Sequence, residues 1–196
     1  MRYEKGRKDA SRRRIIEVAS ERFREDGIAA TGLASVMSDA GMTNGAFYPH
    51  FRSKADLVRE TVTATMDGQT ELMRESIAGG GLEAAIATYL SPGHRDNSAS
   101  GCTLAALLPE LARQPPEARA AYAERFEAVV RAFAAALPAG SADPEAAAIS
   151  IYATLIGSLQ LARAVEGTAL SDRILAAGAD AARAIVRNRG AGRAAE

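Results

Sequence analysis

The sequence predicts an all-α protein, and three observations lead to that class. Alanine is abundant while β-branched residues are few, a balance that favours helix over strand. Apolar residues recur at spacings of three and four along most of the chain. Glycine, proline and cap residues then divide this pattern into segments of helical length, without a strand pattern or an internal repeat.

The N-terminal segment predicts two amphipathic helices. The first covers residues 11–26, and Gly27 provides its stop. Thr31 is the expected N-cap of the second, and Gly41 is the left-handed residue expected to end it. Gly32 stands near the start of this second helix, where a stronger helix former is expected.

A very short third helix and a long fourth one follow. Thr43 can cap the third helix, and Pro49 should end it near Tyr48, because proline disfavours α conformation in the preceding residue. Ser53 begins the capping box S-K-A-D of the fourth helix, which should run to about Ile77 and break at the glycines of 78–81.

The second half of the chain predicts longer helices with clear breaks between them. Residues 91–100 and 138–143 are loops by composition, and Pro109 is expected to kink the helix that contains it. Asp143 can cap a helix that has Pro144 at its first position, and Ser171 can start the last helix. The expected helices cover residues 82–90, 102–113, 115–137, 143–166 and 171–187.

Charge is balanced overall but unevenly distributed. Residues 1–59 hold 12 Lys and Arg against 8 Asp and Glu, a net of +4, while residues 60–196 hold 12 against 16, a net of −4. A basic N-terminal segment followed by an acidic remainder suggests an anionic partner at the N-terminal end. A solvated basic tail would have the same composition.

Several classes of protein are disfavoured by what the sequence lacks. It contains no run of about 18 uncharged apolar residues, so we expect no membrane span, and its charged N-terminus is not a secretory signal. A single cysteine, Cys102, fits a reduced, cytoplasmic setting. Phosphate-loop, nucleophile and metal-ligand motifs are absent, so we expect neither an enzyme nor a cofactor, and His94 is expected to be a surface loop residue.

The run TNGAFYPHFRSK at 43–54 is the most informative stretch. The second helix, the turn at Gly41 and the short third helix together predict a helix-turn-helix, which places the N-terminus of its second helix in the DNA major groove. Small or hydrogen-bonding side chains at that N-terminus allow close approach to DNA, and they are Thr43, Asn44, Gly45 and Ala46.

The remaining members of this run suggest phosphate contacts and a small core. Tyr48 has a phenolic donor, and Lys54 lies at the start of a helix where its ammonium and free N–H groups can share one phosphate. Phe47 and Phe51 are expected to anchor the core of a small domain.

Residues 11–59 resemble the DNA-binding domain of the TetR family of transcriptional regulators. The matching run is RRRIIEVASERFREDGIAATGLASVMSDAGMTNGAFYPHFRSKADLV, about a quarter of the chain, and its Y-x-H-F-x-S-K-x-x-L signature is highly specific. The segment GCTLAALLPELAR from Gly101 also resembles a subgroup with a cysteine there. Pro49, directly after the recognition helix, limits its length.

The resemblance implies a helix-turn-helix DNA-binding domain at 1–59 and a larger helical ligand-binding and dimerisation domain at 60–196. It implies a repressor that binds a palindromic double-stranded DNA operator as a homodimer and that a small-molecule effector releases. The residues implied or expected at the DNA are Thr31, Thr43, Asn44, Gly45, Ala46, Phe47, Tyr48, His50 and Lys54.

Effector and dimer residues are less clearly marked. Candidates for the effector pocket are Tyr89, Cys102, Leu107, Leu108, Tyr122, Phe126 and Tyr152, each of which can equally be plain core. Dimerisation is expected through the apolar faces of the last two helices, which include Ile149, Tyr152, Ile156, Leu159, Ile174, Ala181 and Ile185. The alternative function is an all-helical interaction protein whose single cysteine senses electrophiles or oxidants, against the simpler interpretation of Cys102 as a small buried hydrophobe.

Overall fold

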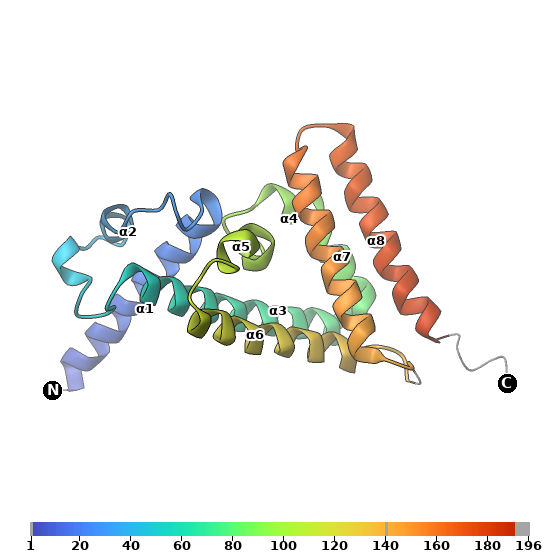
Figure 1. Cartoon of the computed structure of the whole chain (residues 1–196), viewed down its shortest axis with the longest axis horizontal. Helices are drawn as coiled ribbons and strands as arrows, with labels where there is room; N and C mark the ends of the chain where they lie inside the picture. Colours follow the sequence, from blue (N-terminus) through green and yellow to red (C-terminus); the bar gives the residue numbers. More distant parts are fainter. Residues whose placement is uncertain (1, 140, 191–196) are drawn as a thin grey trace.

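The computed structural model describes residues 2–139 and 141–190, and within these ranges every regular element is a helix (Figure 1). The side chains of residues 6–139 and 141–187 are described. In chain order the elements are α1 (Arg2–Asp26), α2 (Leu33–Asp39), the 3₁₀ helix η1 (Asn44–Ala46), α3 (Lys54–Tyr89), α4 (Pro92–Asp96), α5 (Thr103–Leu111), α6 (Pro116–Ala135), α7 (Pro144–Ala164) and α8 (Ala169–Gly190).

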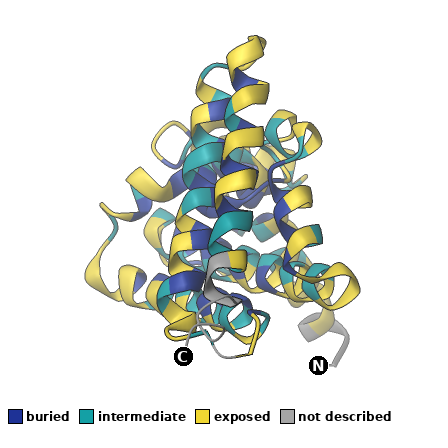
Figure 2. Cartoon of the chain, turned by 90° about the vertical axis from the view of Figure 1, so that its right-hand side faces the viewer, coloured by how far each residue is buried: buried dark blue, intermediate teal, exposed yellow. Residues whose placement is uncertain are grey.

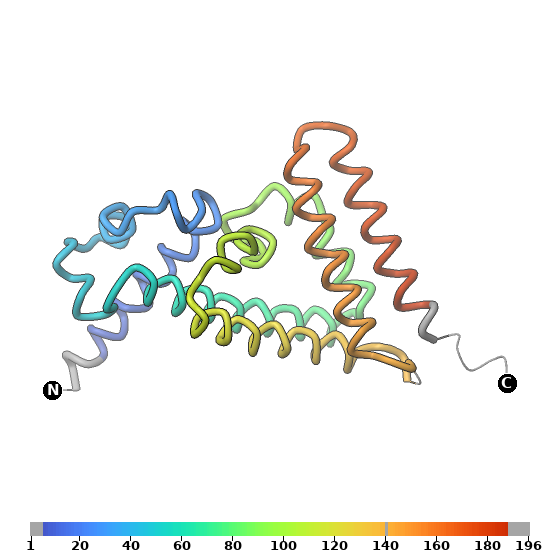
Figure 3. Tube along the Cα trace, viewed as in Figure 1, coloured from blue at the N-terminus to red at the C-terminus, as the bar shows by residue number. Residues whose placement is uncertain are grey.

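The molecule is elongated, with α1, α2 and η1 at one end and the α7–α8 pair at the other (Figures 1 and 3). The long helix α3 connects the two ends: it packs on α1 in its first half and beside α6 further along. One buried apolar cluster extends through the whole molecule, from Ile15 in α1 to Ala182 in α8. The domain division expected at residue 59 therefore falls inside α3, and it stays a prediction.

The start of the chain is more helical than expected, and one expected cap is wrong. Helix α1 begins at Arg2 rather than at residue 11, because the charged N-terminal residues include good helix formers and no proline. Gly32, not Thr31, is the N-cap of α2, with extended φ/ψ of −82° and 147°. Thr31 is buried instead, and its hydroxyl donates to the carbonyl oxygen of Gly27 at 2.7 Å.

The glycine run at 78–81 kinks α3 but does not end it. Only Gly81 leaves helical geometry, with a φ of 70° that favours glycine, and the helix resumes at once to Tyr89. The expected break at Ile77 and the expected helix at 82–90 are thus two limbs of one bent element. The bend lets the second limb pack against α8.

The segment 91–100, expected to be a loop, contains the short helix α4. Ser91 caps it by accepting a hydrogen bond from the His94 N–H at 3.2 Å, and Pro92 stands at its first position. The residues from Ser91 to Asp96, whose composition is typical of a loop, therefore form the cap and the body of a short helix.

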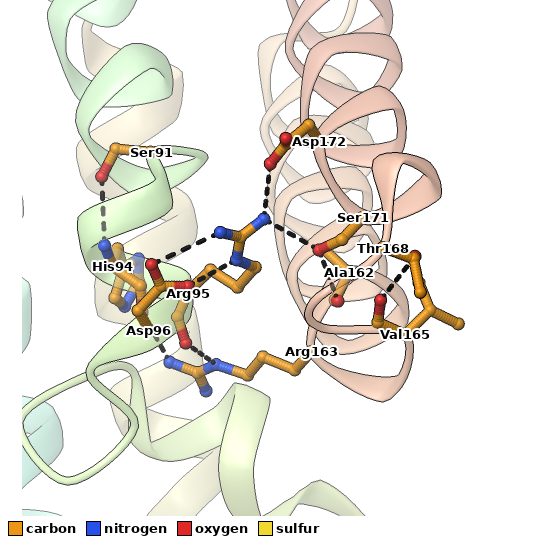
Figure 4. Close-up of polar contacts among 10 residues, drawn as sticks. All are labelled: Ser91, His94, Arg95, Asp96, Ala162, Arg163, Val165, Thr168, Ser171 and Asp172. Atoms are coloured by element: carbon orange, nitrogen blue, oxygen red, sulfur yellow. Dashed lines mark hydrogen bonds and ion pairs between the residues drawn. The ribbon is translucent and has the colours of Figure 1, made fainter.

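A polar cluster joins α4 to the corner between α7 and α8 (Figure 4). The guanidinium of Arg95 donates to the hydroxyl of Ser171 at 2.9 Å and to the carboxylate of Asp172 at 2.6 Å. Arg163 donates to the main-chain oxygens of Arg95 and His94, at 3.1 and 2.8 Å. Ser171 is thus a fully buried link in this cluster rather than the start of the last helix.

One side-chain contact within α5 and one cap of α7 support these two helices. Pro109 cannot donate to the carbonyl oxygen of Ala105, and the side chain of Gln160 from α7 donates to that oxygen at 3.0 Å. Asp143 caps α7 as expected, accepting from the N–H of Ala146 at 2.9 Å.

Helix α7 is long and apolar enough, by length and composition, to cross a membrane, although we expected no such segment from the sequence. A core helix passes the same test, and 44% of its apolar window is buried in this structure. It packs against α5, α6 and α8, and Leu155 and Leu159 are fully buried. The packing therefore accounts for its apolar composition.

We predict that Gly178→Ala destabilises the fold, because α7 and α8 cross closely at this residue. A Cβ atom at Gly178 would lie 2.5 Å from the Cβ of Ser158 and 3.2 Å from Leu90. Such overpacking costs about 1–3 kcal/mol, measurable as a lower midpoint of urea unfolding. The control is Gly68→Ala in α3, where a Cβ meets nothing within 4 Å and helix propensity should raise stability. Equal effects of the two substitutions would contradict close packing at Gly178.

Candidate nucleic-acid interface and interior cavity

The turn after α2 has the geometry that a helix-turn-helix requires. Gly41 is left-handed, with φ of +73°, as expected from the sequence. The N–H of Gly41 donates to Ser38 at 2.9 Å and the N–H of Met42 to Met37 at 2.8 Å. This pair of bonds is the Schellman arrangement, in which a glycine lets the last carbonyls of a helix find partners while the chain reverses direction.

The segment after the turn is shorter than expected. Thr43 is the N-cap by backbone position, but its side chain forms no capping hydrogen bond, and the helix that follows is a three-residue 3₁₀ helix. Thr43, Asn44 and Gly45 are exposed, while Ala46 is half-buried. The hydroxyl and amide of this edge therefore remain available for a partner outside the chain.

The three aromatic residues of this run divide between core and surface. Phe47 and Phe51 are buried, with ring centroids 5.6 Å apart. Tyr48 is 72% exposed and stands edge-on to Phe47. Phe47 and Thr31 are both buried, so neither can present its side chain to DNA. Both were expected to contact DNA, and the structure shows that their side chains pack in the core instead.

His50 lies at the border of this face. It is half-buried, and burial together with nearby Lys8 and Arg12 lowers its pKa, so that the neutral ring is favoured. Arg12 stacks over the ring of Phe51 at 5.0 Å and forms an ion pair of 2.8 Å with Glu60.

Lys54 begins α3 beside this edge. Ser53 caps the helix as expected, accepting from the Asp56 N–H at 3.1 Å, but the Asp56 carboxylate accepts from Arg52 rather than from Ser53. The ammonium of Lys54 donates to the carbonyl oxygen of Ala29 at 3.4 Å, near the limit for a hydrogen bond. The cation and the helix N-terminus thus lie together, an arrangement that binds anions.

The loop between α1 and α2 is held by a carboxylate from α5. Glu110 accepts from the N–H of Ile28 at 3.0 Å and from the N–H of Ala29 at 2.8 Å. Gly27 is left-handed with φ of +84°, and a Cβ there would lie 2.8 Å from the Glu110 carboxylate. This contact joins residues more than 80 positions apart, and no local pattern around Glu110 indicates it.

A cavity of about 360 Å³, open to solvent on one side where exposed Leu72, Thr88 and Ser100 line it, lies in the larger helical body, within the range of small-molecule sites. It is bordered by both limbs of α3, by α4, by the start of α5, and by α6 and α7. Three of the expected residues, Tyr89, Cys102 and Tyr152, line it. The other four do not line it: Leu107 and Tyr122 are packed in the core, Phe126 stacks on Tyr152, and Leu108 is exposed.

Polar side chains around the cavity are largely occupied by the protein itself. Gln69 donates to the Gly101 oxygen at 2.6 Å and accepts from the Thr103 N–H at 3.1 Å. His94, expected at the surface, bonds through one ring nitrogen to the Tyr89 oxygen at 2.7 Å and accepts the Cys102 N–H at 3.0 Å through the other. Burial lowers the His94 pKa, which keeps the ring neutral and suited to both bonds.

Cys102 is a buried thiol at the N-cap of α5, 3.8 Å from the Tyr152 hydroxyl. Burial raises the pKa of both Tyr89 and Tyr152 well above the usual value, and the nearby thiol adds to that increase. These phenols therefore stay protonated. No Asp, Glu, Lys or Arg lines the cavity within the ranges that the structure describes.

The residues expected at the dimer interface separate into two groups. Tyr152, Ile156 and Leu159 are buried inside the chain, so they cannot contact a second copy, and they are corrected to core residues. Ile149 and Ala181 are exposed, and Ile174 and Ile185 are half-buried. Figure 2 views this end of the molecule and shows exposed positions recurring along its helices. The exposed apolar residues on α7 and α8 include Ile149, Ala153, Leu161, Leu170, Ala177 and Ala181.

Among the described residues, no group of three His, Cys, Asp or Glu side chains is placed to hold a metal ion.

Comparison with known proteins agrees with this geometry. Residues 15–61 match the family model of the bacterial regulatory proteins of the tetR family. The HTH-type transcriptional regulator TtgR of Pseudomonas putida is 39% identical over 66 residues, 34% of this chain and 31% of that protein. The HTH-type transcriptional repressor KstR2 of Rhodococcus jostii is 31% identical over 86 residues, 41% of this chain and 42% of that protein. The matches thus span about a third to two fifths of these relatives' length.

Solved structures share the fold over nearly the whole chain. A TetR-family regulator from Cytophaga hutchinsonii superposes with a TM-score of 0.75 at 18% identity, covering 91% of this chain and 96% of that one. The reduced form of NemR from E. coli superposes with a TM-score of 0.72 at 18% identity, covering 86% and 95%. The helix-turn-helix region at 15–61 thus matches the bacterial regulatory proteins of the tetR family, and the whole chain shares the helical fold of solved TetR-family regulators.

Proposed function

We propose that this protein is a cytoplasmic repressor that binds a palindromic operator as a homodimer and leaves it when a small molecule fills the cavity. The observation that carries the proposal is the exposed edge from Thr43 to Tyr48 beside Lys54 at the N-terminus of α3. A gel shift against the upstream region of the protein's own gene tests it. Failure to bind that region or any other double-stranded DNA would overturn it.

The exposed edge from Thr43 to Tyr48, with Lys54 beside it, offers some side chains suited to DNA bases and others suited to phosphates. Asn44 is exposed. Its side-chain oxygen can accept from the N6 amino group of adenine, and its NH₂ group can donate to adenine N7, in the major groove. Tyr48 and Lys54 supply a hydroxyl and an ammonium for phosphate oxygens, which fix position without reading sequence. His50 is a weaker phosphate ligand because its neutral form is favoured.

Dimerisation would pair two such edges. The exposed apolar residues of α7 and α8 lie at the end opposite the helix-turn-helix, where Leu161 is 61% exposed. Small residues among them, such as Ala153 and Ala177, permit close helix approach. Binding to two successive major grooves requires the two recognition edges of such a dimer to lie about 34–36 Å apart, one turn of DNA.

The effector that suits the cavity is uncharged and mostly apolar. An ion that exchanges water for the apolar part of the wall loses hydration without compensation, and no described lining residue carries a full charge to offset that loss. Met66 and Met73 add flexible apolar surface that can adapt to a ligand's shape.

We predict that Lys54→Ala weakens operator binding about equally on all DNA sequences. One lost phosphate contact should lower the slope of log affinity against log salt by about 0.9. Tyr48→Phe should also weaken binding while leaving the melting temperature nearly unchanged, because the ring on Phe47 remains. Arg119→Ala, an exposed cation on α6, is the matched control. An unchanged salt slope for Lys54→Ala would remove this lysine from the contacts.

We predict that Leu161→Asp converts a dimer to a monomer, because it places a charge within the exposed apolar face of α7. Light scattering at micromolar concentration measures the mass. Leu108→Asp, on an exposed leucine of α5, should remain dimeric. A monomeric wild-type protein would exclude the paired-site mechanism.

We predict that the cavity discriminates by charge among ligands of one shape. Calorimetry should detect binding of 2-acetylnaphthalene, an uncharged ketone, and little binding of 2-naphthoate, its anionic counterpart. Met73→Trp, which adds bulk to the cavity wall, should abolish ketone binding. Equal affinity for the anion would argue against an uncharged effector.

A further inference from the structure

Helix α5 spans the distance between the cavity and the DNA-binding domain. Its N-cap, Cys102, lines the cavity, and Glu110 near its other end holds the loop between α1 and α2. Nine helical residues are about 13 Å long. Figure 1 shows α5 beside the end of α1 and above α3, and α5 also packs on α7.

The cavity end of α5 is fixed by side chains that themselves line the cavity. Gln69 of α3 bonds to both residues that flank Cys102, and His94 accepts the N–H of Cys102 itself. A ligand that displaces Gln69 or His94 therefore removes the bonds that set the start of α5. No rearrangement of the apolar core is needed for that step.

The other end of α5 meets the DNA-binding domain through backbone bonds. The two carboxylate oxygens of Glu110 accept hydrogen bonds from the N–H groups of Ile28 and Ala29. The carbonyl oxygen of the same Ala29 receives the ammonium of Lys54. Gly27, which has no Cβ to block the carboxylate, makes this approach possible. A shift of Glu110 thus reaches the residue proposed to hold a phosphate.

We infer that Glu110 is the positioning residue through which the state of the cavity sets the orientation of the helix-turn-helix, with α5 as the rigid link. This inference rests on the proposed function, since it assigns the path of regulation between the two proposed sites. The competing path is α3 alone, which also runs from the cavity to Lys54. The two paths differ in whether Glu110 is required.

A double-mutant cycle on operator affinity separates the paths. Gln69→Ala loosens the cavity end of α5, and Glu110→Ala releases the far end. Distant substitutions without shared partners normally add. If α5 carries the signal, Gln69→Ala changes operator affinity between about twofold and thirtyfold in the wild-type background and has no effect once Glu110 is alanine. Additive effects would overturn the inference in favour of α3.

A graded series and a control identify the carboxylate as the cause. Glu110→Gln keeps the size of the side chain but offers only one acceptor oxygen, so its effect should fall between wild type and Glu110→Ala. Glu75→Ala, an exposed carboxylate on α3, should leave the Gln69 effect intact. A Gln69 effect undiminished in Glu110→Gln and Glu110→Ala would also overturn the inference.

A second measurement needs no DNA and remains decisive if the operator assay fails. Amide hydrogen exchange at Ile28 and Ala29 reports the bonds to Glu110 directly. Gln69→Ala should accelerate exchange at these two amides severalfold while leaving core amides such as that of Leu159 protected. Unchanged exchange at both amides would overturn the inference, whereas accelerated exchange without operator binding would leave it standing and count against the DNA-binding proposal alone.

Discussion

The continuous buried face of α3 is the constraint on which the rest of the structure depends. Its first half presents Leu57, Val58 and Val62 to the core that includes α1, and its second limb presents Leu82 and Ile86 to the core of the larger body. Because one helix supplies both cores, the two ends of the molecule cannot turn freely about a linker. The orientation of the helix-turn-helix is therefore a property of the whole fold.

Polar contacts then select one arrangement among those that the shared helix allows. Apolar packing is non-directional, so small rotations of α1 against α3 cost little. The Glu110 carboxylate requires both loop N–H groups at hydrogen-bond distance, which makes the arrangement specific. The Arg95 cluster plays the same part at the other end, fixing α4 to the α7–α8 corner. Each site is thus held by directional bonds on an apolar frame.

Local features of the fold could be predicted from the sequence, and distant contacts could not. Gly41, Ser53 and Asp143 act as expected because caps and left-handed turns depend on a few neighbouring residues. The cap expected at Thr31 is wrong, because a buried threonine and a capping threonine give the same sequence pattern. His94 and Glu110 take their roles from partners that the fold brings together, and nothing near Glu110 in the chain marks Ile28 and Ala29 as its partners.

The two proposed sites rely on different forces, and this difference bears on how one can control the other. Phosphate binding as proposed for Lys54 and Tyr48 would be electrostatic and would weaken steeply with salt. Binding in a cavity without described charged lining residues rests on apolar burial, which moderate salt changes little. An effector could shift the DNA-binding equilibrium only by its differential affinity for two arrangements of the protein. His94 and Gln69 would provide such a difference if, as proposed, their bonds to the start of α5 are present in one arrangement and absent from the other.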